Sequence, residues 1–448
     1  MNYNKLCKYK KSIMKQLGKT VLILLILSCS VVTSLMGQKK YTLEQCHSMA
    51  LKNNIRMKQA GIGLDSTIET RKEAFTKYFP TISATGTSYI SNKGLVQMSL
   101  SPDMQMSLLK NGIIGGVTAT QPLFAGGRII NGNKLAKVGV EVSKLQMQQT
   151  ENEVNLTTEQ YYWQVVTLEE KLRTIIAIEN MLNNWCKDVE AAVKAGVKNR
   201  NDLLQVELKR NDIASNKIKI ENGVLLSKLI LGQYIGDTSG NFNVTNSIIE
   251  DEQLILPDII KTDHIQALQY IPESHLLDKN VEANKLKRNM TIGKYLPTVS
   301  IGAGYMYDDL MDKAHPFGIA FATVSVPISD WWGGSHAIKK QKFKLINAYN
   351  ERNDSRELLV IKMQKLWNDL DDAYKQLQIA KLSIEQATEN LKLNNDYYLA
   401  GTTNMSDLLD AQSLFQQSKD KYADAYASYQ IAKLDYLQST GQHLIIDK

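Results

Sequence analysis

The residues that could do chemistry are thinly spread along this chain of 448 residues. Its six histidines stand apart from one another, and none is paired at the spacing of metal ligands. The segments Gly126–Arg128 and Trp331–Gly334 are rich in glycine, but neither has the lysine and hydroxyl spacing of a nucleotide-binding loop. No arrangement of serine, histidine and aspartate and no isolated carboxylate pair stands out. The sequence therefore predicts a protein that is not an enzyme and that uses no cofactor or metal.

The net charge of +7 comes mainly from the first residues of the chain. Six lysines precede the apolar run Val21–Leu27, and no acidic residue occurs before Glu44. These are the basic and apolar regions of an export signal, so residues 1–38 are predicted to be a signal peptide. Without the six lysines, 47 basic residues face 46 acidic ones. A chain that is this close to neutral lacks the excess of positive charge that nucleic-acid binding requires, so no nucleic-acid partner is expected.

Two processing routes are open for this leader. Cleavage near Gly37 or Gln38 is favoured, because the stretch after Cys29 stays apolar through Met36. Alternatively, Ile26–Cys29 resembles a bacterial lipobox, in which Cys29 would be lipidated. Beyond the leader no run of 18 apolar residues occurs, so a transmembrane helix is not expected. An exported chain of this kind is either periplasmic or crosses a membrane as strands.

The sequence repeats itself over a long period. Gly196 followed by Asp202 recurs 205 positions later as Gly401 followed by Asp407. In each copy the glycine fits the end of one helix and the aspartate fits the N-cap of the next, so a helical hairpin turns there. A period this long exceeds a solenoid unit and indicates a duplicated domain. The predicted repeats are 39–262 and 263–448.

Each repeat is predicted to contain two short strands between long helices. Apolar residues recur every seven positions along 334–399 and 404–440, which is the pattern of long supercoiled helices. The strand-like segments have about ten residues each, the length that a tilted membrane strand requires. They are 81–90, 112–123, 298–307 and 317–326, and 91–111 is expected to be a longer connection in the first repeat.

Four strands per chain set a limit on the assembly. A soluble hairpin remains an alternative for these strands taken alone, and an elongated coiled coil for any one helix. In a membrane, however, four strands cannot close a barrel, and lipid does not tolerate open sheet edges. The chain would have to oligomerise there, and three copies would supply 12 strands, an even number within the bacterial range.

Several short motifs occur in an order that resembles one known family. They are Tyr41–Cys46 at the opening helix, Phe79–Thr81 and Leu296–Thr298 at helix-to-strand entries, Gln121–Phe124 with Gly126–Arg128 at a strand-to-helix exit, and Tyr398–Thr402 with Asp407–Ala411 at a hairpin tip. Together with the duplication and the export signal, these motifs resemble the outer membrane efflux proteins, the TolC-like exit ducts of tripartite export systems.

The resemblance implies a mostly α fold with transmembrane β strands. It implies a homotrimer that forms a 12-stranded outer membrane β-barrel, continued across the periplasm by a coiled-coil α-barrel. Such a channel conducts substrates passively in a tripartite efflux or type I secretion system. Its expected partners are a periplasmic adaptor (membrane fusion protein), an inner-membrane RND or ABC transporter, and outer membrane lipid. The alternative is a periplasmic adaptor or structural coiled-coil protein, and neither the exported substrate nor the pump family can be read from the residues.

The resemblance also places an acidic constriction at the second hairpin tip. Asp407 and Asp410 match the family's constriction positions, and in a trimer they would form two rings of three carboxylates. Such rings attract cations and discourage anions. Alternatively, Asp407 is only an acidic residue that the helix dipole favours.

A polar latch between the hairpins is the third feature that the resemblance implies. Tyr398 matches a tyrosine of that latch, and Asp202 matches its acidic partner. Thr403 stands where the best-known members carry an arginine, which predicts a weaker or differently connected closed state. Lys198 and Arg200 in the opposing tip are candidates to replace that charge.

Overall fold

The computed structural model describes residues 39–93, 96–101, 104–108, 111–245, 254–309 and 314–442. The predicted signal peptide, residues 1–38 with Cys29, lies outside the described residues. The chain divides into two compact units. The sheet unit comprises the described residues of Leu51–Thr157, Leu254–Ile379 and Ser428–Lys448, and the hairpin unit comprises those of Met1–Ala50, Thr158–Gln253 and Ala380–Ala427. Each unit draws on both predicted repeats, whose boundary stays a prediction.

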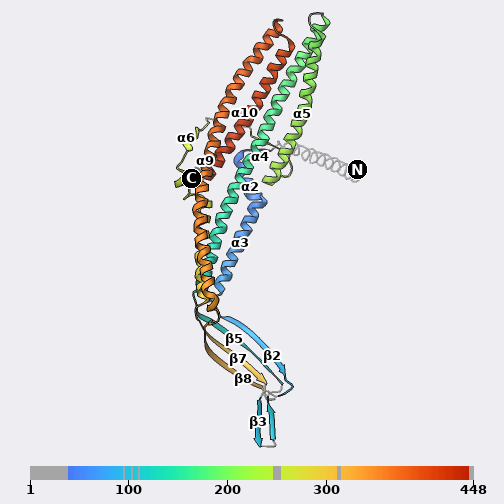
Figure 1. The fold of residues 1–448 in the computed structure, drawn as a ribbon. Coiled ribbons are helices and arrows are strands. Elements are labelled where there is room, and N and C mark those ends of the chain that lie inside the picture. The colour runs from blue at the N-terminus through green and yellow to red at the C-terminus, as the bar shows by residue number, and fades with distance from the viewer. Residues whose placement is uncertain are drawn as a thin grey trace, which may run out of the picture. The chain divides into compact units, whose positions relative to one another are not determined.

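A four-stranded antiparallel sheet forms the main β part of the sheet unit (Figure 1). Its strands are β2 (Thr81–Ile90), β5 (Asn111–Ala125), β7 (Thr298–Asp309) and β8 (Ala314–Ser325), in the order β2-β5-β7-β8. The four predicted strands are thus confirmed. The central pair joins the two repeats, with Ala119 of β5 opposite Ala303 of β7. β2 and β8 are the edges of this sheet.

The register sorts the sheet into an apolar face and a mixed face. Because side chains alternate along a strand, residues paired with Ile301 and Tyr305 share their face. That face carries Ile82, Ala84, Ile90, Ile113, Val117, Ala119, Val299, Ile301, Ala303, Tyr305, Tyr307, Ala320, Ala322 and Val324, with Ser88, Gln121 and Asp309 among its polar members. The other face carries hydroxyls on β2 and β5 (Thr81, Ser83, Thr85, Thr87, Thr118 and Thr120) and apolar groups on β8 (Phe317, Ile319 and Phe321). The apolar face is open to solvent in the single chain, with Tyr305 63% exposed.

The connection predicted over 91–111 contains a second hairpin that the sequence prediction missed. β3 (Val96–Ser101) pairs with β4 (Met104–Leu108) in antiparallel register. In both segments methionine or leucine alternates with glutamine or serine, which is the period-two pattern of a strand. That alternation was the available signal.

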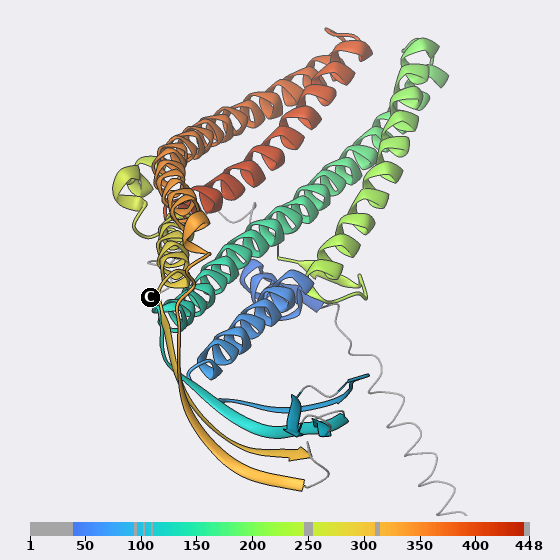
Figure 2. The same cartoon turned by 60° about the horizontal axis from the view of Figure 1, so that its bottom comes forward.

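All four junctions between helix and strand lie at the same end of the sheet (Figure 2). α3 (Ile55–Thr76) leads into β2 and α8 (Pro272–Lys294) leads into β7, whereas β5 leads into α4 (Arg128–Lys194) and β8 into α9 (Trp331–Leu399). Antiparallel pairing accounts for this arrangement. In the pairs β2–β5 and β7–β8 the chain turns back at the far end of the sheet, so the helices before and after each pair attach at the near end. At the β5–α4 junction Gly126 has a φ of 62°, and a Cβ on it would lie 2.1 Å from the carbonyl oxygen of Gly293. Only glycine fits this close approach of two backbones.

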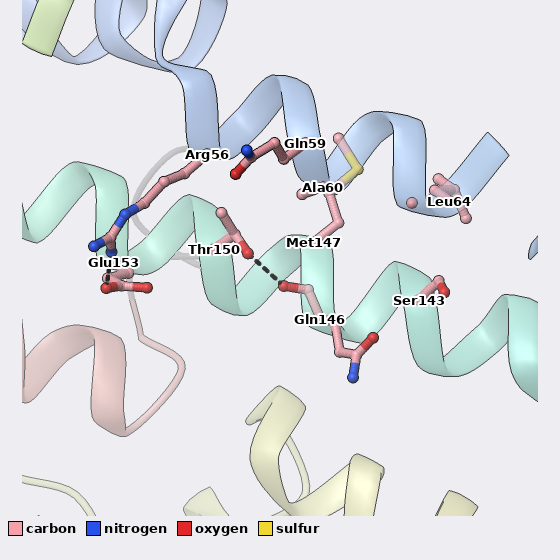
Figure 3. A pocket seen from close by; sticks show the side chains of 10 residues that line it. Arg56, Gln59, Ala60, Leu64, Ser143, Gln146, Met147, Thr150 and Glu153 are labelled. Carbon is pink, nitrogen blue, oxygen red and sulfur yellow. Dashed lines mark hydrogen bonds and ion pairs between the residues drawn. The ribbon is translucent and has the colours of Figure 1, made fainter. Parts of the chain in front are cut away.

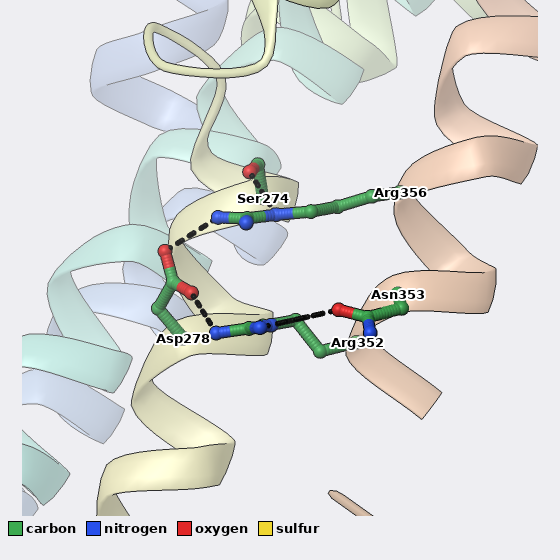
Figure 4. Close-up of polar contacts among 5 residues, drawn as sticks. All are labelled: Ser274, Asp278, Arg352, Asn353 and Arg356. Carbon is green, nitrogen blue, oxygen red and sulfur yellow. Dashed lines mark hydrogen bonds and ion pairs between the residues drawn. The ribbon is translucent and has the colours of Figure 1, made fainter. Parts of the chain in front are cut away.

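A polar clamp joins α8 to α9 within the sheet unit (Figure 4). The Arg356 guanidinium donates to the Asp278 carboxylate at 2.8 Å, and Arg352, one helical turn earlier, lies 3.7 Å from the same carboxylate. Arg356 also donates to the Ser274 hydroxyl at 3.3 Å. The charged side chains Asp278, Arg352 and Arg356 are partly exposed, so each ion pair contributes at most about 1 kcal/mol. The clamp fixes the pairing of the two helices more than it stabilises them.

The long helices bury the predicted apolar seams. Along α9, Met363, Leu370 and Leu377 are at most 1% exposed. Their seven-residue spacing therefore marks a packed stripe, as predicted. Among the described residues, no helix combines the length and the apolar character needed to cross a membrane.

The hairpin unit contains both helical hairpins and a small sheet. α4 turns into α5 (Arg200–Ile235), and α9 turns into α10 (Met405–Ser439). β1 (Lys39–Tyr41) pairs in parallel with β6 (Phe242–Val244), next to α2 (Leu43–Asn53) in sequence. Two short helices follow in the sheet unit, α6 (Pro257–Ile260) and α7 (His264–Ala267), one on each side of the predicted boundary between the repeats.

Candidate functional site at the hairpin tips

The two hairpins turn through the same backbone conformation. Gly196 and Gly401 have φ angles of 71° and 73°, in the left-handed region that favours glycine. Their N–H groups bond back to Val193 and Tyr398 at 3.0 and 3.1 Å, which ends each helix. A Cβ at either glycine would meet nothing within 4 Å. Backbone conformation, not space, therefore requires glycine at both predicted tips.

Asparagine caps the helix that follows each tip, which corrects the sequence prediction. The Asn199 side chain accepts from the N–H of Asn201 at 3.2 Å, and the Asn404 side chain accepts from the N–H of Asp407 at 2.9 Å. Asp202 and Asp407 were predicted as N-caps but lie inside the first helical turn. Asparagine is the cap because Asn199 and Asn404 stand just outside the helix, where the amide oxygen of a short side chain reaches the free N–H groups of the first turn.

Asp407 and Asp410 share the exposed face at the start of α10. They are three residues apart, which puts both carboxylates on one side of the helix. Met405 and Leu408, on the other side, are 0% exposed. The Thr403 hydroxyl donates to the Asp407 carboxylate at 2.6 Å. The second tip therefore presents two solvent-facing carboxylates, one of them held by Thr403.

Tyr398 is buried against the first tip of the same chain. Its ring lies under the Lys198 ammonium, 4.0 Å from the ring centre, in a cation–π contact. Burial, and then the nearby Asp202 carboxylate, raise the pKa of Tyr398 to about 12. Its covered hydroxyl makes no hydrogen bond to any described residue. The structure thus brings Tyr398, Asp202 and Lys198 together, without a hydrogen bond between tyrosine and aspartate.

A shared core lies beneath the tips. The apolar cluster that includes Tyr398 takes residues from all four helices of the two hairpins. Its buried members are Ile175, Ile178, Leu182, Cys186, Val189, Val206, Ile213, Tyr398, Met405, Leu408 and Leu409. The sequence predicted hairpins but could not pair them, because contacts between segments some 200 residues apart leave no local pattern.

Two polar links also join the hairpins. The Lys209 ammonium of α5 donates to the Ser413 hydroxyl of α10 at 2.8 Å, and the Lys171 ammonium of α4 pairs with the Asp424 carboxylate of α10 at 2.7 Å. These contacts fix which faces of the hairpins meet. Sequence reasoning missed all four residues for the same reason.

A separate hollow lies between α3 and α4 in the sheet unit (Figure 3). It measures about 480 Å³ and is lined mostly by polar and small side chains. Its two charged residues, Arg56 and Glu153, form an ion pair with each other. Among the described residues, no group of histidine, cysteine, aspartate and glutamate could hold a metal ion. The hollow therefore offers no free charge, and the hairpin tips remain the candidate site.

Long helical hairpins joined to a sheet with an exposed apolar face are the features of this fold that the comparison with known families can test. The outer membrane efflux protein family model matches residues 47–237 and 282–442, more than half of the chain, and the chain belongs to that family. Its members are outer membrane channels and not enzymes, so the protein resides in the outer membrane and extends into the periplasm.

Individual relatives are distant. Outer membrane protein TolC of Escherichia coli (strain K12) is 22% identical over 139 residues, a match that spans 31% of this chain and only 28% of TolC. The fold is similar to VceC from Vibrio cholerae, at a TM-score of 0.72 and 12% identity, covering 89% of this chain and 96% of VceC. It is also similar to the open state of the MtrE outer membrane channel from Neisseria gonorrhoeae. That match has a TM-score of 0.70 and 14% identity, and it covers 89% of this chain and 88% of MtrE. At such identities the solved structures establish the fold alone.

Proposed function

We propose that this chain is the exit duct of a tripartite efflux or type I secretion system. The observation that carries the proposal is the four-stranded sheet, which has one predominantly apolar face and two unpaired edges, β2 and β8. Buried edge groups without partners are too costly in hydrocarbon, so neighbouring copies must pair with them. Three copies would close a barrel of 12 strands.

The two faces of the sheet suit such a barrel. Ile82 and Val324, on the apolar face of the two edge strands, are 71% and 65% exposed in the single chain. Lipid would cover them in the barrel. The hydroxyl-bearing face of β2 and β5 would then line the pore, as alternating strands of membrane barrels require.

The hairpin tips would form the periplasmic gate. Asp407 and Asp410 of three copies would make two acidic rings that favour cations. The Lys198 contact with the Tyr398 ring and the shared core, which hold the two hairpins of a chain together, would belong to the closed state. Opening would separate those hairpins and break this contact. Because Lys198 occupies the position that corresponds to Thr403 by the 205-residue repeat, it supplies a cation from the first tip and not from the second.

The partners follow from this architecture. A channel without an energy source depends on an inner-membrane RND or ABC transporter and on a periplasmic adaptor, which would dock against the tips around Gly196 and Gly401. The pump would select the substrate.

Channel recordings and fractionation test the proposal together. The full-length protein, purified from outer membranes in detergent, should insert into planar lipid bilayers and give discrete conductance steps. Mock preparations from cells that lack the gene are the control. Recovery in the soluble periplasm with no conductance would favour the alternative of an adaptor or structural coiled-coil protein.

A further inference from the structure

Positive charge gathers where the helices of the sheet unit meet the sheet. The four junction segments 71–80, 126–140, 283–297 and 326–350 contain fourteen basic residues, named here the junction collar. They are Arg71, Lys72, Lys77, Arg128, Lys134, Lys137, Lys285, Lys287, Arg288, Lys294, Lys339, Lys340, Lys342 and Lys344. The same segments contain two carboxylates, Glu73 and Asp330. Since the chain beyond the leader is nearly neutral, this density is local.

Most cations of the junction collar have no carboxylate partner. Among the described residues, only Lys72 and Lys137 of the collar form ion pairs, with Glu69 at 2.7 Å and with Glu141 at 4.0 Å. Like charges gathered in this way repel one another unless an anion lies among them. An anionic partner would therefore relieve the repulsion among the collar cations.

Aromatic rings stand beside these cations. In the first repeat Phe75 and Tyr78 contact each other edge to face at 5.6 Å and are 55% and 39% exposed. In the second repeat Trp331 and Trp332 are 48% and 83% exposed. Tyrosine and tryptophan favour the boundary between hydrocarbon and water. Both repeats thus place exposed rings at the level where the strands end.

Two hollows combine the cations with the rings. The first, of about 540 Å³ between α3 and α4, sets Phe75 and Tyr78 among basic residues. Those residues are Arg71, Lys72, Lys134 and Lys137. The second, of about 470 Å³ on α9, surrounds Phe343 with His336, Lys339, Lys340 and Lys344. Each offers cations for a phosphate and an apolar surface for the start of an acyl chain.

We infer that the junction collar binds the phosphate headgroups of anionic phospholipids in the leaflet that faces the helices. This inference rests on the proposed membrane insertion of the sheet. Charge complementarity identifies the occupant, because clustered lysine and arginine next to a hydrocarbon boundary attract anionic lipids. At the other end of the sheet, Asp308 and Asp309 of β7 are accompanied by Lys93 after β2, so the described residues show no comparable excess of positive charge there. The asymmetry would set the direction and the depth of the barrel in the membrane.

Quenching of tryptophan by brominated lipids tests the inference. Trp331 and Trp332 lie in the same junction segments as the collar. The other tryptophans, Trp163, Trp185 and Trp367, follow the first residue of α4 or α9 by at least about 50 Å of helix. The full-length protein is reconstituted into bilayers that mix ordinary phosphatidylcholine with brominated phosphatidylglycerol or brominated phosphatidylcholine. We expect severalfold stronger quenching by the anionic lipid, and a loss of this preference as ionic strength rises.

Charge-matched variants locate the effect. The quadruple variant Lys339→Gln, Lys340→Gln, Lys342→Gln and Lys344→Gln should bring the ratio of anionic to zwitterionic quenching close to one. The control variant changes four exposed lysines of the hairpin unit. It carries Lys187→Gln, Lys219→Gln, Lys381→Gln and Lys392→Gln. The control should keep the native ratio. If the α9 variant does not fold, Arg71→Gln with Lys134→Gln removes collar charge from the first repeat instead.

The outcomes separate the inference from the proposed function. Channels that conduct but show no preference for anionic lipid, or a control that loses the preference equally, would overturn the collar alone. A collar variant that changes the ion selectivity of the pore and leaves lipid preference intact would place these cations in the lumen, which also overturns it. Protein that forms no channel in any bilayer contradicts the proposed function first.

Discussion

The two hairpin tips share a backbone and differ in their charges. At an offset of 205 residues Gly196 corresponds to Gly401, and the capping residue Asn199 corresponds to Asn404. The side chains between them have diverged, since Lys198 faces the Tyr398 ring whereas its counterpart Thr403 bonds Asp407. The two tips thus share the residues that shape the turn, whereas their charged side chains make the first tip basic and the second acidic.

The largest effect is expected in the core that the tips share. Leu408 is 0% exposed, so Leu408→Ala should lower the free energy of unfolding by about 2–5 kcal/mol, through lost burial and a cavity. Leu204 of the first tip is 46% exposed, and Leu204→Ala should cost much less. Thermal unfolding in detergent, followed by circular dichroism, measures both. A loss below about 1 kcal/mol at Leu408 would contradict the packing described for the second tip.

The next effect tests the shared backbone. Gly196→Ala and Gly401→Ala should each destabilise the chain by about 1–2 kcal/mol, because a Cβ is disfavoured in the left-handed conformation. Gly63, inside α3 with nothing within 4 Å of a Cβ, is the matched control. Gly63→Ala should stabilise the helix by up to about 1 kcal/mol. The same melting experiment decides, and equal effects at all three glycines would argue against the turn geometry.

The acidic tip should control which ions pass. A cation about 4 Å from one carboxylate in water gains about 1 kcal/mol, so loss of two rings should lower the cation preference severalfold. Reversal potentials of the double variant Asp407→Asn and Asp410→Asn, in a salt gradient across a planar bilayer, measure this. Asp202→Asn in the first tip is the control and should change the potential less. An unchanged potential in the double variant would remove both aspartates from the constriction.

The smallest effect is expected at Tyr398. Since its hydroxyl has no hydrogen-bond partner among the described residues, Tyr398→Phe should change stability at neutral pH by no more than about 1 kcal/mol. Above pH 10 the native protein should be the less stable of the two. Its folded pKa of about 12 exceeds the ordinary 10, so the unfolded chain releases the proton first and rising pH favours unfolding.

Melting curves of both proteins between pH 8 and pH 12 check this sign. Parallel curves would mean that burial and Asp202 do not hold the tyrosine neutral. If conductance and antibiotic leakage are also unchanged in Tyr398→Phe, the hydroxyl has no part in a latch, and only the ring contact with Lys198 remains.

Patterns local to the sequence predicted most elements of the fold. The seven-residue spacing of Met363, Leu370 and Leu377 was enough to predict a packed helix, and both tip glycines were placed correctly. The strands were recognised from alternation, yet the same pattern in β3 and β4 was missed. Local periodicity therefore predicts well whether a segment is a helix or a strand, provided that every segment of the chain is checked for it.

Contacts between distant segments could not be predicted in this way. Nothing near Tyr398 in the sequence indicates that Lys198 covers its ring, although Lys198 was a candidate for a missing charge. The caps were misassigned because aspartate and asparagine both satisfy the rule, and only the structure shows which one lies outside the helix. The junction collar also escaped notice, since its cations are far apart in the chain and meet only where α3, α4, α8 and α9 reach the sheet.

The proposed function depends on neighbouring copies that complete this sheet. Native mass spectrometry of the protein extracted from outer membranes in detergent measures the number of chains directly. We expect three copies of the processed chain, and no folded species that persists as a monomer without detergent. A stable single chain in detergent-free buffer, with its apolar sheet face in water, would contradict it.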